Sequence, residues 1–234
     1  LKIMSLALSS TGEALYYSLP RDIYRFNTQK NNSELIWKAN KDNGYSFLGI
    51  SPDDQTLAIS NMNSLTILAL SDLTVKKSFS GKYFGNYQRP QFTQNGEYLA
   101  IPTADALGEI TVFETKDWNT FKVFPTPGIK RSVLSPDGSL LALAYGDTGE
   151  IELVDVHSGN IVSTTSVSAI GMGKMVFDPS GKLLVLAAST GPDADMFENL
   201  LVIEVSTGVE LPPLISFYEP GGLVFSADGN SILI

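Results

Sequence analysis

The stretch Ser-Pro-Asp-Gly-Ser-Leu at residues 135–140 decides the fold, because variants of it recur along the whole chain. The other copies are SSTGEA at 9–14, SPDDQT at 51–56, TQNGEY at 93–98, DPSGKL at 178–183 and SADGNS at 226–231. Each copy has turn chemistry, because Pro presets φ and Gly or Asn tolerates positive φ. Each copy also lies between two apolar stretches, so it predicts a tight connection between two antiparallel strands.

The fourth residue of each turn defines the period of the repeat. These residues are Gly12, Asp54, Gly96, Gly138, Gly181 and Gly229, at steps of 42, 42, 42, 43 and 48. A period of about 40–45 residues with several short strands is typical of one blade of a β-propeller. The sequence therefore predicts an all-β propeller fragment with five four-stranded blades and the first half of a sixth.

The fourth repeat shows the expected strands a to d most clearly. Strand a covers 132–134, strand b 140–145, strand c 150–156 and strand d 161–165. Strand b is continuously apolar, which indicates burial on both faces. The same pattern predicts strands c and d in the other repeats, at 22–27 and 34–39, 65–70 and 75–79, 109–115 and 121–124, and 200–205 with a strand near 211–215.

The repeats divide the chain into one propeller domain over residues 1–234. Their bounds are about 1–42, 43–84, 85–126, 127–169, 170–217 and a partial repeat at 218–234. The long fifth step is explained by an insertion between strands b and c at 189–199, where a loop tolerates extra residues. Because an incomplete ring leaves edges unpaired, we expect this chain to be part of a parent propeller, with seven blades favoured over six or eight.

Composition narrows the classes of function. The chain has 43% hydrophobic residues, 18% charged residues, a net charge of −9 and no cysteine. The acidic balance argues against nucleic acid as a partner, because counterion release needs clustered Lys and Arg. The lack of cysteine excludes disulfides and thiolate metal sites. No apolar run approaches 18 residues, so no membrane span is expected. The compartment stays open, with the cytoplasm favoured over the periplasm or secretion.

The turn at 135–138, the period and the segment Val154-Asp155-Val156-His157-Ser158-Gly159 together resemble degenerate WD40 repeats, as found in propellers with Ser-Pro-Asp-Gly turns. The resemblance covers the whole chain and implies a propeller fold, but it does not specify a function. The Gly-His pair and the Trp-Asp dipeptide of that family are absent, since the tryptophans are Trp37 and Trp118. The polar network that those residues form in the family is therefore not expected here.

The candidate catalytic and metal-binding residues favour structural roles. His157 lies in a turn beside Ser158 and Asp155, and adjacent positions do not give the convergent geometry of a catalytic triad. The acidic loop at 191–199 lacks the third ligand and the turn glycine of a calcium loop. Gly171-Met172-Gly173 lacks the third glycine and the helix of a phosphate-binding loop. Asp53, Asp54 and Asp147 are interpreted as turn-forming residues.

The remaining candidate site is the rim where the d–a and b–c loops gather. Aromatic and cationic side chains beside Gly and Asn are typical of protein contact surfaces. The expected contact residues are Tyr45, Tyr83, Phe84, Tyr87, Arg89, Lys130, Arg131 and Tyr218. The stretch 81–89, with three aromatic residues and one arginine, is the strongest of these candidates.

These observations predict a non-catalytic scaffold or sensor propeller, with no cofactor, that binds a protein, a peptide or other domains of the same chain. Two alternatives stay open at this point. One is a propeller that gates or supports a peptidase-like or lactonase-like enzyme. The other is a propeller that binds a small ligand or a quinone cofactor, since Asp155–Asn160 is similar to a motif of such proteins. Fold alone does not choose among these functions.

Overall fold

The computed structural model describes residues 2–20, 22–38, 46–81, 89–103, 108–146, 148–167, 171–189, 198–212, 216–217, 223–226 and 228–233. Within these ranges the regular structure consists of β-strands, and no helix is present. The chain falls into two compact units, Leu1–Pro125 and Thr126–Ile234. The boundary between the units lies one residue before the expected boundary between the third and fourth repeats.

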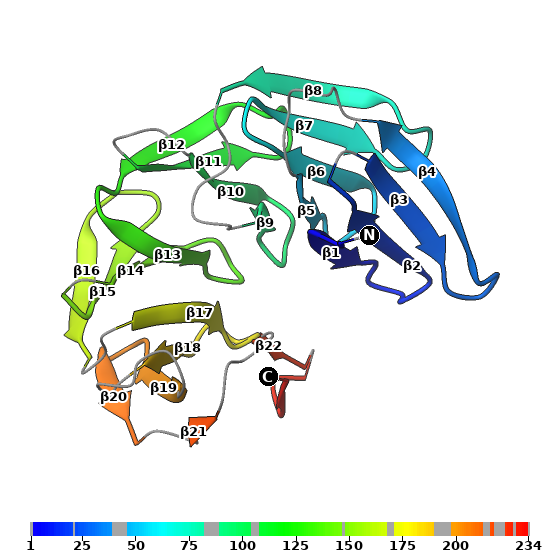
Figure 1. Ribbon diagram of the computed structural model, residues 1–234. Helices are drawn as coiled ribbons and strands as arrows, with labels where there is room; N and C mark the ends of the chain where they lie inside the picture. Colours follow the sequence, from blue (N-terminus) through cyan, green and yellow to red (C-terminus); the bar gives the residue numbers. More distant parts are fainter. Residues whose placement is uncertain are drawn as a thin grey trace. The chain divides into compact units, whose positions relative to one another are not determined.

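The first unit holds three four-stranded antiparallel sheets, which we call blades one to three (Figure 1). Blade one comprises β1 (Ser5–Leu8), β2 (Ala14–Ser18), β3 (Asp22–Asn27) and β4 (Asn32–Lys38). Blade two comprises β5 (Phe47–Ile50), β6 (Thr56–Ser60), β7 (Ser64–Ala69) and β8 (Val75–Ser80). Blade three comprises β9 (Gln91–Phe92), β10 (Tyr98–Thr103), β11 (Glu109–Glu114) and β12 (Thr120–Pro125).

The second unit holds blades four and five and a hairpin, which we call blade six. Blade four comprises β13 (Ile129–Leu134), β14 (Leu140–Tyr145), β15 (Glu150–Asp155) and β16 (Ile161–Ser166). Blade five comprises β17 (Gly171–Phe177), β18 (Leu183–Ser189), β19 (Glu198–Glu204), β20 (Val209–Leu211) and β21 (Ser216–Phe217), which also pairs with β19. Blade six is the pair β22 (Val224–Phe225) and β23 (Ile232–Leu233).

Strand order follows chain order in every four-stranded sheet, as the repeat predicts. The apolar second strands are the most deeply buried, and all five residues of β6 are buried. The fourth strands are mostly exposed, as in β8. This gradient arises because neighbouring blades cover the inner strands on both faces. The predicted fold class is therefore confirmed, whereas the number of blades in the parent ring stays a prediction.

One predicted strand begins earlier than expected, and residues 213–215 of its expected range lie outside the described residues. The fourth strand of blade five is expected near 211–215, but β20 covers Val209–Leu211. Gly208, with φ of +67°, closes the preceding turn, so the strand begins at the next residue. Strand pairing then ends at Leu211, before Pro212, which has no N–H for a sheet ladder. The apolar residues around 211–215 were therefore a poorer guide than the turn chemistry.

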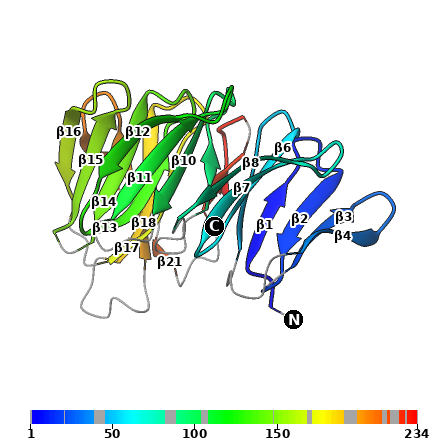
Figure 2. The same cartoon turned by 90° about the horizontal axis from the view of Figure 1, so that it is seen from above.

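The cores lie between neighbouring blades within each unit. Between blades one and two, Tyr16 and Ile23 pack against Leu57 and Leu68 in one cluster of buried side chains. A second cluster joins blades two and three, a third joins blades four and five, and a fourth joins blades five and six. Figure 2 shows β1–β4 and β5–β8 of the first unit as neighbouring sheets. Each blade is therefore stabilised mainly by the blade beside it.

Candidate functional site

The turns between the first and second strands share one hydrogen-bond pattern. In blade four, Ser135 Oγ accepts from the N–H of Leu140 at 2.9 Å and donates to Asp137 Oδ1 at 2.6 Å. Asp137 also accepts from the N–H of Ser139 at 3.0 Å. The same hydroxyl-to-carbonyl or hydroxyl-to-carboxylate bond recurs in the pairs Ser51–Asp53, Thr93–Asn95 and Ser226–Asp228.

Blade five builds the same turn with the chemical roles exchanged. Asp178 stands first, and its Oδ1 accepts from the N–H of Leu183 at 2.7 Å. Ser180 stands third, and its Oγ donates to Asp178 Oδ2 at 2.5 Å. One hydrogen bond thus links the same two positions, with carboxylate and hydroxyl interchanged. The turn requires a donor–acceptor pair at these positions, and it does not require a particular order.

These bonds hold the turn carboxylates in their ionised form. Bonds from Ser51 Oγ lower the pKa of Asp53, and bonds from Ser226 Oγ lower the pKa of Asp228 to about 2. Burial by itself would raise the pKa of Asp137, but the hydrogen bonds from Ser135 and Ser139 outweigh it. A carboxylate that accepts such bonds is a poor general base at neutral pH. The hydrogen bonds of these aspartates therefore stabilise the turns.

A cleft of about 670 Å³ lies in the first unit, beside the turns of blades two and three. Its lining includes Lys76 from β8 and Lys116 from the turn after β11, and both lysine side chains are exposed. Lys76 Nζ donates to Thr56 Oγ1 at 3.1 Å. Asp53 is the acidic residue of the lining. The remaining lining residues are Ser51, Pro52, Thr56, Phe92, Gln94, Asn95, Gly96, Thr115 and Trp118.

Trp118 is held in an unusual backbone conformation at this cleft. Its φ is +61°, in the left-handed region that a bulky side chain rarely adopts. Gly159 in blade four and Gly208 in blade five occupy the same turn position, where the N–H bonds to the carbonyl four residues earlier. The Trp118 ring packs edge-on against Phe92, with 6.4 Å between centroids, and is 9% exposed. Burial of the indole therefore compensates for the backbone strain.

A second cleft of about 520 Å³ occupies the corresponding place on blade five. Asp178, Lys182 and Glu204 are among its lining residues, with Ser180, Gly181, Leu183, Val205 and Ser206. Its charged residues are one lysine and two acids, and it has no aromatic side chain. The cleft of the first unit differs from this one because two lysines and two aromatic residues, Phe92 and Trp118, line it. It is therefore the better candidate for binding a ligand.

The structure describes three of the eight predicted contact residues. Arg89 is exposed just before β9, and its Nη1 donates to the carbonyl of Leu6 at 2.9 Å. Arg131 lies on β13 and donates through Nε to the carbonyl of Gly173 at 3.0 Å. Lys130 lies beside it, exposed, with its aliphatic chain over Gly146. Arg89 thus links the segment before blade three to blade one, and Arg131 links blade four to blade five. Tyr45, Tyr83, Phe84, Tyr87 and Tyr218 lie outside the described residues.

The other candidates that the structure describes lie in turns and strands. Asp155 accepts from the N–H of Ser158 at 2.6 Å, inside the turn that carries His157. Gly171-Met172-Gly173 lies in strand β17, not before a helix. Asp53 and Asp54 lie in a turn as predicted, whereas Asp147 and most of the acidic loop at 191–199 lie outside the described residues.

Two negative findings apply to the described part of the chain. No group of three or more His, Asp and Glu side chains is placed to hold a metal ion there. No helix within the described ranges is long and apolar enough to cross a membrane.

Sequence reasoning missed the cleft because its residues come from four separate segments. Lys76 and Lys116 have no motif in common, and only the folded blades place them along the same cleft. One signal was available. Trp118 occupies a turn position that holds glycine in two other repeats, and a bulky residue in place of a repeated glycine indicates a special local role.

Comparison with known proteins supports the fold. No model of a known protein family matches the chain, and no curated protein sequence matches it. Among solved structures, the chain is similar to hydrazine synthase from Kuenenia stuttgartiensis, a protein that contains a β-propeller. The TM-score is 0.77 at 15% sequence identity, and the match covers 98% of this chain and 72% of the other. At this identity the likeness concerns the fold alone, and the chain is built of β-propeller blades.

Proposed function

We propose that this protein is a non-catalytic propeller that binds an acidic segment of a partner protein in the cleft of the first unit. The observation that carries the proposal is the lining itself, which combines two exposed lysines with Phe92 and Trp118. Aromatic side chains supply contact area at low entropic cost, and lysines attract carboxylates. The proposal develops the protein- or peptide-binding function that the sequence predicts.

The shape and chemistry of the cleft favour a peptide over a buried small molecule. Turn residues line much of it, and Gln94, whose side chain is exposed, adds an amide that can donate and accept hydrogen bonds. The lysine ammonium groups stay near water, so their attraction to a partner's carboxylates is modest and salt-dependent. The expected complex is therefore weak to moderate in affinity and sensitive to ionic strength.

The predicted contact stretch at 81–89 stays a second candidate surface. Arg89 links to the Leu6 carbonyl of blade one, so its replacement would also weaken a contact between blades. A clean test of this surface therefore replaces Tyr83 and Phe84 and keeps Arg89. If partner capture is unchanged in this double variant, the contact surface does not include those two aromatic residues.

Fluorescence can test the cleft directly, because Trp118 lines it and the chain has two tryptophans. Trp37→Phe makes Trp118 the sole indole reporter. The probe is a blocked hexapeptide of glutamate, with a hexapeptide of lysine for comparison. We expect a saturable change in Trp118 emission with the glutamate peptide alone, and a lower affinity at high salt.

The double variant Lys76→Gln/Lys116→Gln should weaken binding of the glutamate peptide by about twofold to thirtyfold, since two exposed charge pairs are worth roughly 0.2–1 kcal/mol each. Lys30→Gln is the matched control, because Lys30 is exposed in a turn of blade one and does not line the cleft. Equal responses to both peptides, or no loss of affinity in the double variant, would contradict the proposal.

A further inference from the structure

One turn position holds asparagine in blade three and aspartate in three other blades. The third residue of the turn is Asp53 in blade two, Asp137 in blade four and Asp228 in blade six. In blade three it is Asn95, and Gly96 follows it. An asparagine before a glycine is prone to lose its side-chain amide, because glycine has no side chain to hinder attack by its own backbone nitrogen. The product of that reaction, aspartate, is the residue that the equivalent turns already contain.

Hydrogen bonds fold the Asn95 side chain over its own turn. Its Oδ1 accepts from Thr93 Oγ1 at 2.6 Å and from the N–H of Glu97 at 3.1 Å. Its Nδ2 donates to Glu97 Oε2 at 2.8 Å. A bond from the N–H two residues on makes an Asx turn, which keeps the side-chain carbonyl beside the following peptide. The group that would be attacked is therefore held next to the peptide of Gly96.

The same turn restrains the attacking nitrogen. The N–H of Gly96 donates to the Thr93 carbonyl at 2.9 Å, so this bond has to break before the nitrogen can attack. Asn95 and Glu97 are exposed, and exposed turns open locally at low cost in free energy. The hydrogen bonds of the turn should therefore set the rate of the reaction without preventing it.

We propose that Asn95 is a site of spontaneous deamidation, and that its conversion weakens the cleft of the first unit for acidic partners. The Gly96 nitrogen forms a bond to Asn95 Cγ, the bond from Cγ to Nδ2 breaks, and the proton of the attacking nitrogen leaves with ammonia. Water then opens the cyclic imide at either carbonyl and gives aspartate or isoaspartate. The net reaction is the hydrolysis of one amide by one water, and it needs no oxidant or reductant.

The reaction changes the charge of the cleft, because Asn95 lines it. The charged lining residues are Lys76, Lys116 and Asp53, so a further carboxylate would balance the two lysines. It would also place a negative charge where Nδ2 now donates to Glu97, and repulsion would replace that hydrogen bond. Isoaspartate would in addition insert its β-carbon into the backbone of the turn. Acidic peptides should therefore bind the converted protein less tightly, an effect that rests on the proposed function, whereas the chemistry does not.

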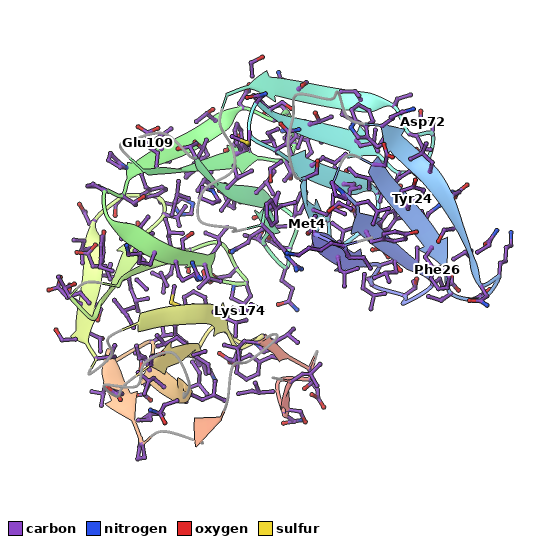
Figure 3. The ribbon with its side chains drawn as sticks, viewed as in Figure 1. Met4, Tyr24, Phe26, Asp72, Glu109 and Lys174 are labelled. Carbon is purple, nitrogen blue, oxygen red and sulfur yellow. The ribbon has the colours of Figure 1, made fainter. Side chains whose placement is uncertain are left out.

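Peptide mapping by mass spectrometry tests the chemistry after warm incubation of the native protein at neutral pH. We expect aspartate and isoaspartate to accumulate at position 95. Asn27 is the internal control, because it ends β3 next to Phe26, which Figure 3 labels, and its Oδ1 also accepts from the N–H two residues on, at 3.1 Å. Thr28 follows it, and a branched side chain hinders the attack, so Asn27 should keep its amide. Retention of the amide at position 95, while a blocked peptide of residues 93–98 deamidates, would overturn the proposal.

Thr93→Val tests whether the turn sets the rate. The variant keeps a branched side chain but loses the hydroxyl that bonds to Asn95 Oδ1. Position 95 should then convert about twofold to tenfold faster, the effect expected from the loss of one hydrogen bond. Equal rates in the variant and the wild type would contradict control of the reaction by the turn.

Asn95→Asp tests the effect on binding without the chemistry. In the Trp118 fluorescence assay it should bind the glutamate hexapeptide about 1.5-fold to fivefold more weakly than the wild type, the effect of one exposed charge. Asn27→Asp adds the same charge in blade one, away from the cleft lining, and should leave the affinity unchanged. Unchanged affinity in Asn95→Asp would overturn the effect on the cleft. If position 95 converts but neither the wild type nor the variants bind the glutamate peptide, the proposed function is wrong and the deamidation site is confirmed.

Discussion

The carboxylate of Asp54 in blade two accepts three hydrogen bonds from Ser10 in blade one, two from the N–H at 2.8 and 2.9 Å and one from Oγ at 2.6 Å. Ser10 is the second residue of the turn at 9–14, and Asp54 is the fourth residue of the turn at 51–56. At the same two positions Pro52 lies against Gly96, and Pro136 against Gly181. Proline has no N–H to donate. A hydrogen-bonded Ser–Asp pair and an apolar Pro–Gly pair therefore make the same contact between neighbouring turns in two different ways.

Replacing the Ser10–Asp54 pair with a Pro–Gly pair should reveal an energetic coupling between the two turns. Ser10→Pro removes both donors and should cost about 1 kcal/mol in the free energy of unfolding. In Ser10→Pro/Asp54→Gly the Pro–Gly contact replaces the lost bonds, and Gly relieves the positive φ of Asp54, so the double variant should be more stable than the sum of the single effects. Urea unfolding of the four proteins measures the coupling. Strict additivity would show that the two turns do not interact.

Acid should destabilise the protein through its turn carboxylates. The pKa values of Asp53, Asp137 and Asp178 are lowered in the folded state, and that of Asp228 is about 2. A group with a lowered folded pKa contributes stability above its unfolded pKa of about 3.8, and this contribution is lost as pH falls through the folded value. The urea midpoint should therefore fall between about pH 4 and pH 2.

Asp137→Asn tests whether the turn carboxylates cause this loss. The amide oxygen can still accept from Ser135, but it carries no charge to protonate. The variant should therefore lose less stability than the wild type between the same pH values, measured by the shift in urea midpoint. If the urea midpoint of the variant falls as much as that of the wild type, groups other than Asp137 cause the loss of stability in acid.

Two replacements of Trp118 should separate the stabilisation from burying the indole from the cost of the backbone strain. Trp118→Ala loses the packing of the indole and keeps a left-handed residue, and should cost about 3–5 kcal/mol. Trp118→Gly loses the same packing but relieves the strain of positive φ, so it should be more stable than the alanine variant by about 1 kcal/mol. Chemical denaturation followed by circular dichroism compares the two. An alanine variant as stable as the glycine variant would mean that the turn is not strained.

Gly49 should not tolerate a side chain. A Cβ at this position on β5 would lie 2.3 Å from the carbonyl oxygen of Pro90 in the next blade. Gly49→Ala should therefore force a backbone shift and cost about 1–3 kcal/mol. Gly171→Ala on β17 is the matched control, because its Cβ would meet only Ser189 at 3.6 Å. Similar losses of stability for both would show that the close approach at Gly49 is relieved without cost.

Local sequence patterns determined the repeat and most strand positions. β14 at Leu140–Tyr145 and β3 at Asp22–Asn27 have the predicted bounds. The polar turn with left-handed Gly138 limits where β14 begins, and the turn with left-handed Asn31 follows the end of β3. Prediction was weaker in blade five, where apolar residues near 211–215 were preferred over the turn that ends at Gly208. Turn chemistry is encoded by neighbouring residues, so it can be identified from sequence.

Contacts between repeats were decided only by the tertiary structure. The sequence alone shows that Ser10, Asp54, Lys76, Lys116 and Trp118 lie in or near turns. It does not show that Asp54 receives the hydrogen bonds of Ser10, or that the lysines and the indole line one cleft. The predicted rim residues Arg89 and Arg131 likewise prove to bond to backbone carbonyls of other blades. The physical reason is separation along the chain, because the period places equivalent residues about 42 positions apart and only packing of the blades brings their side chains together.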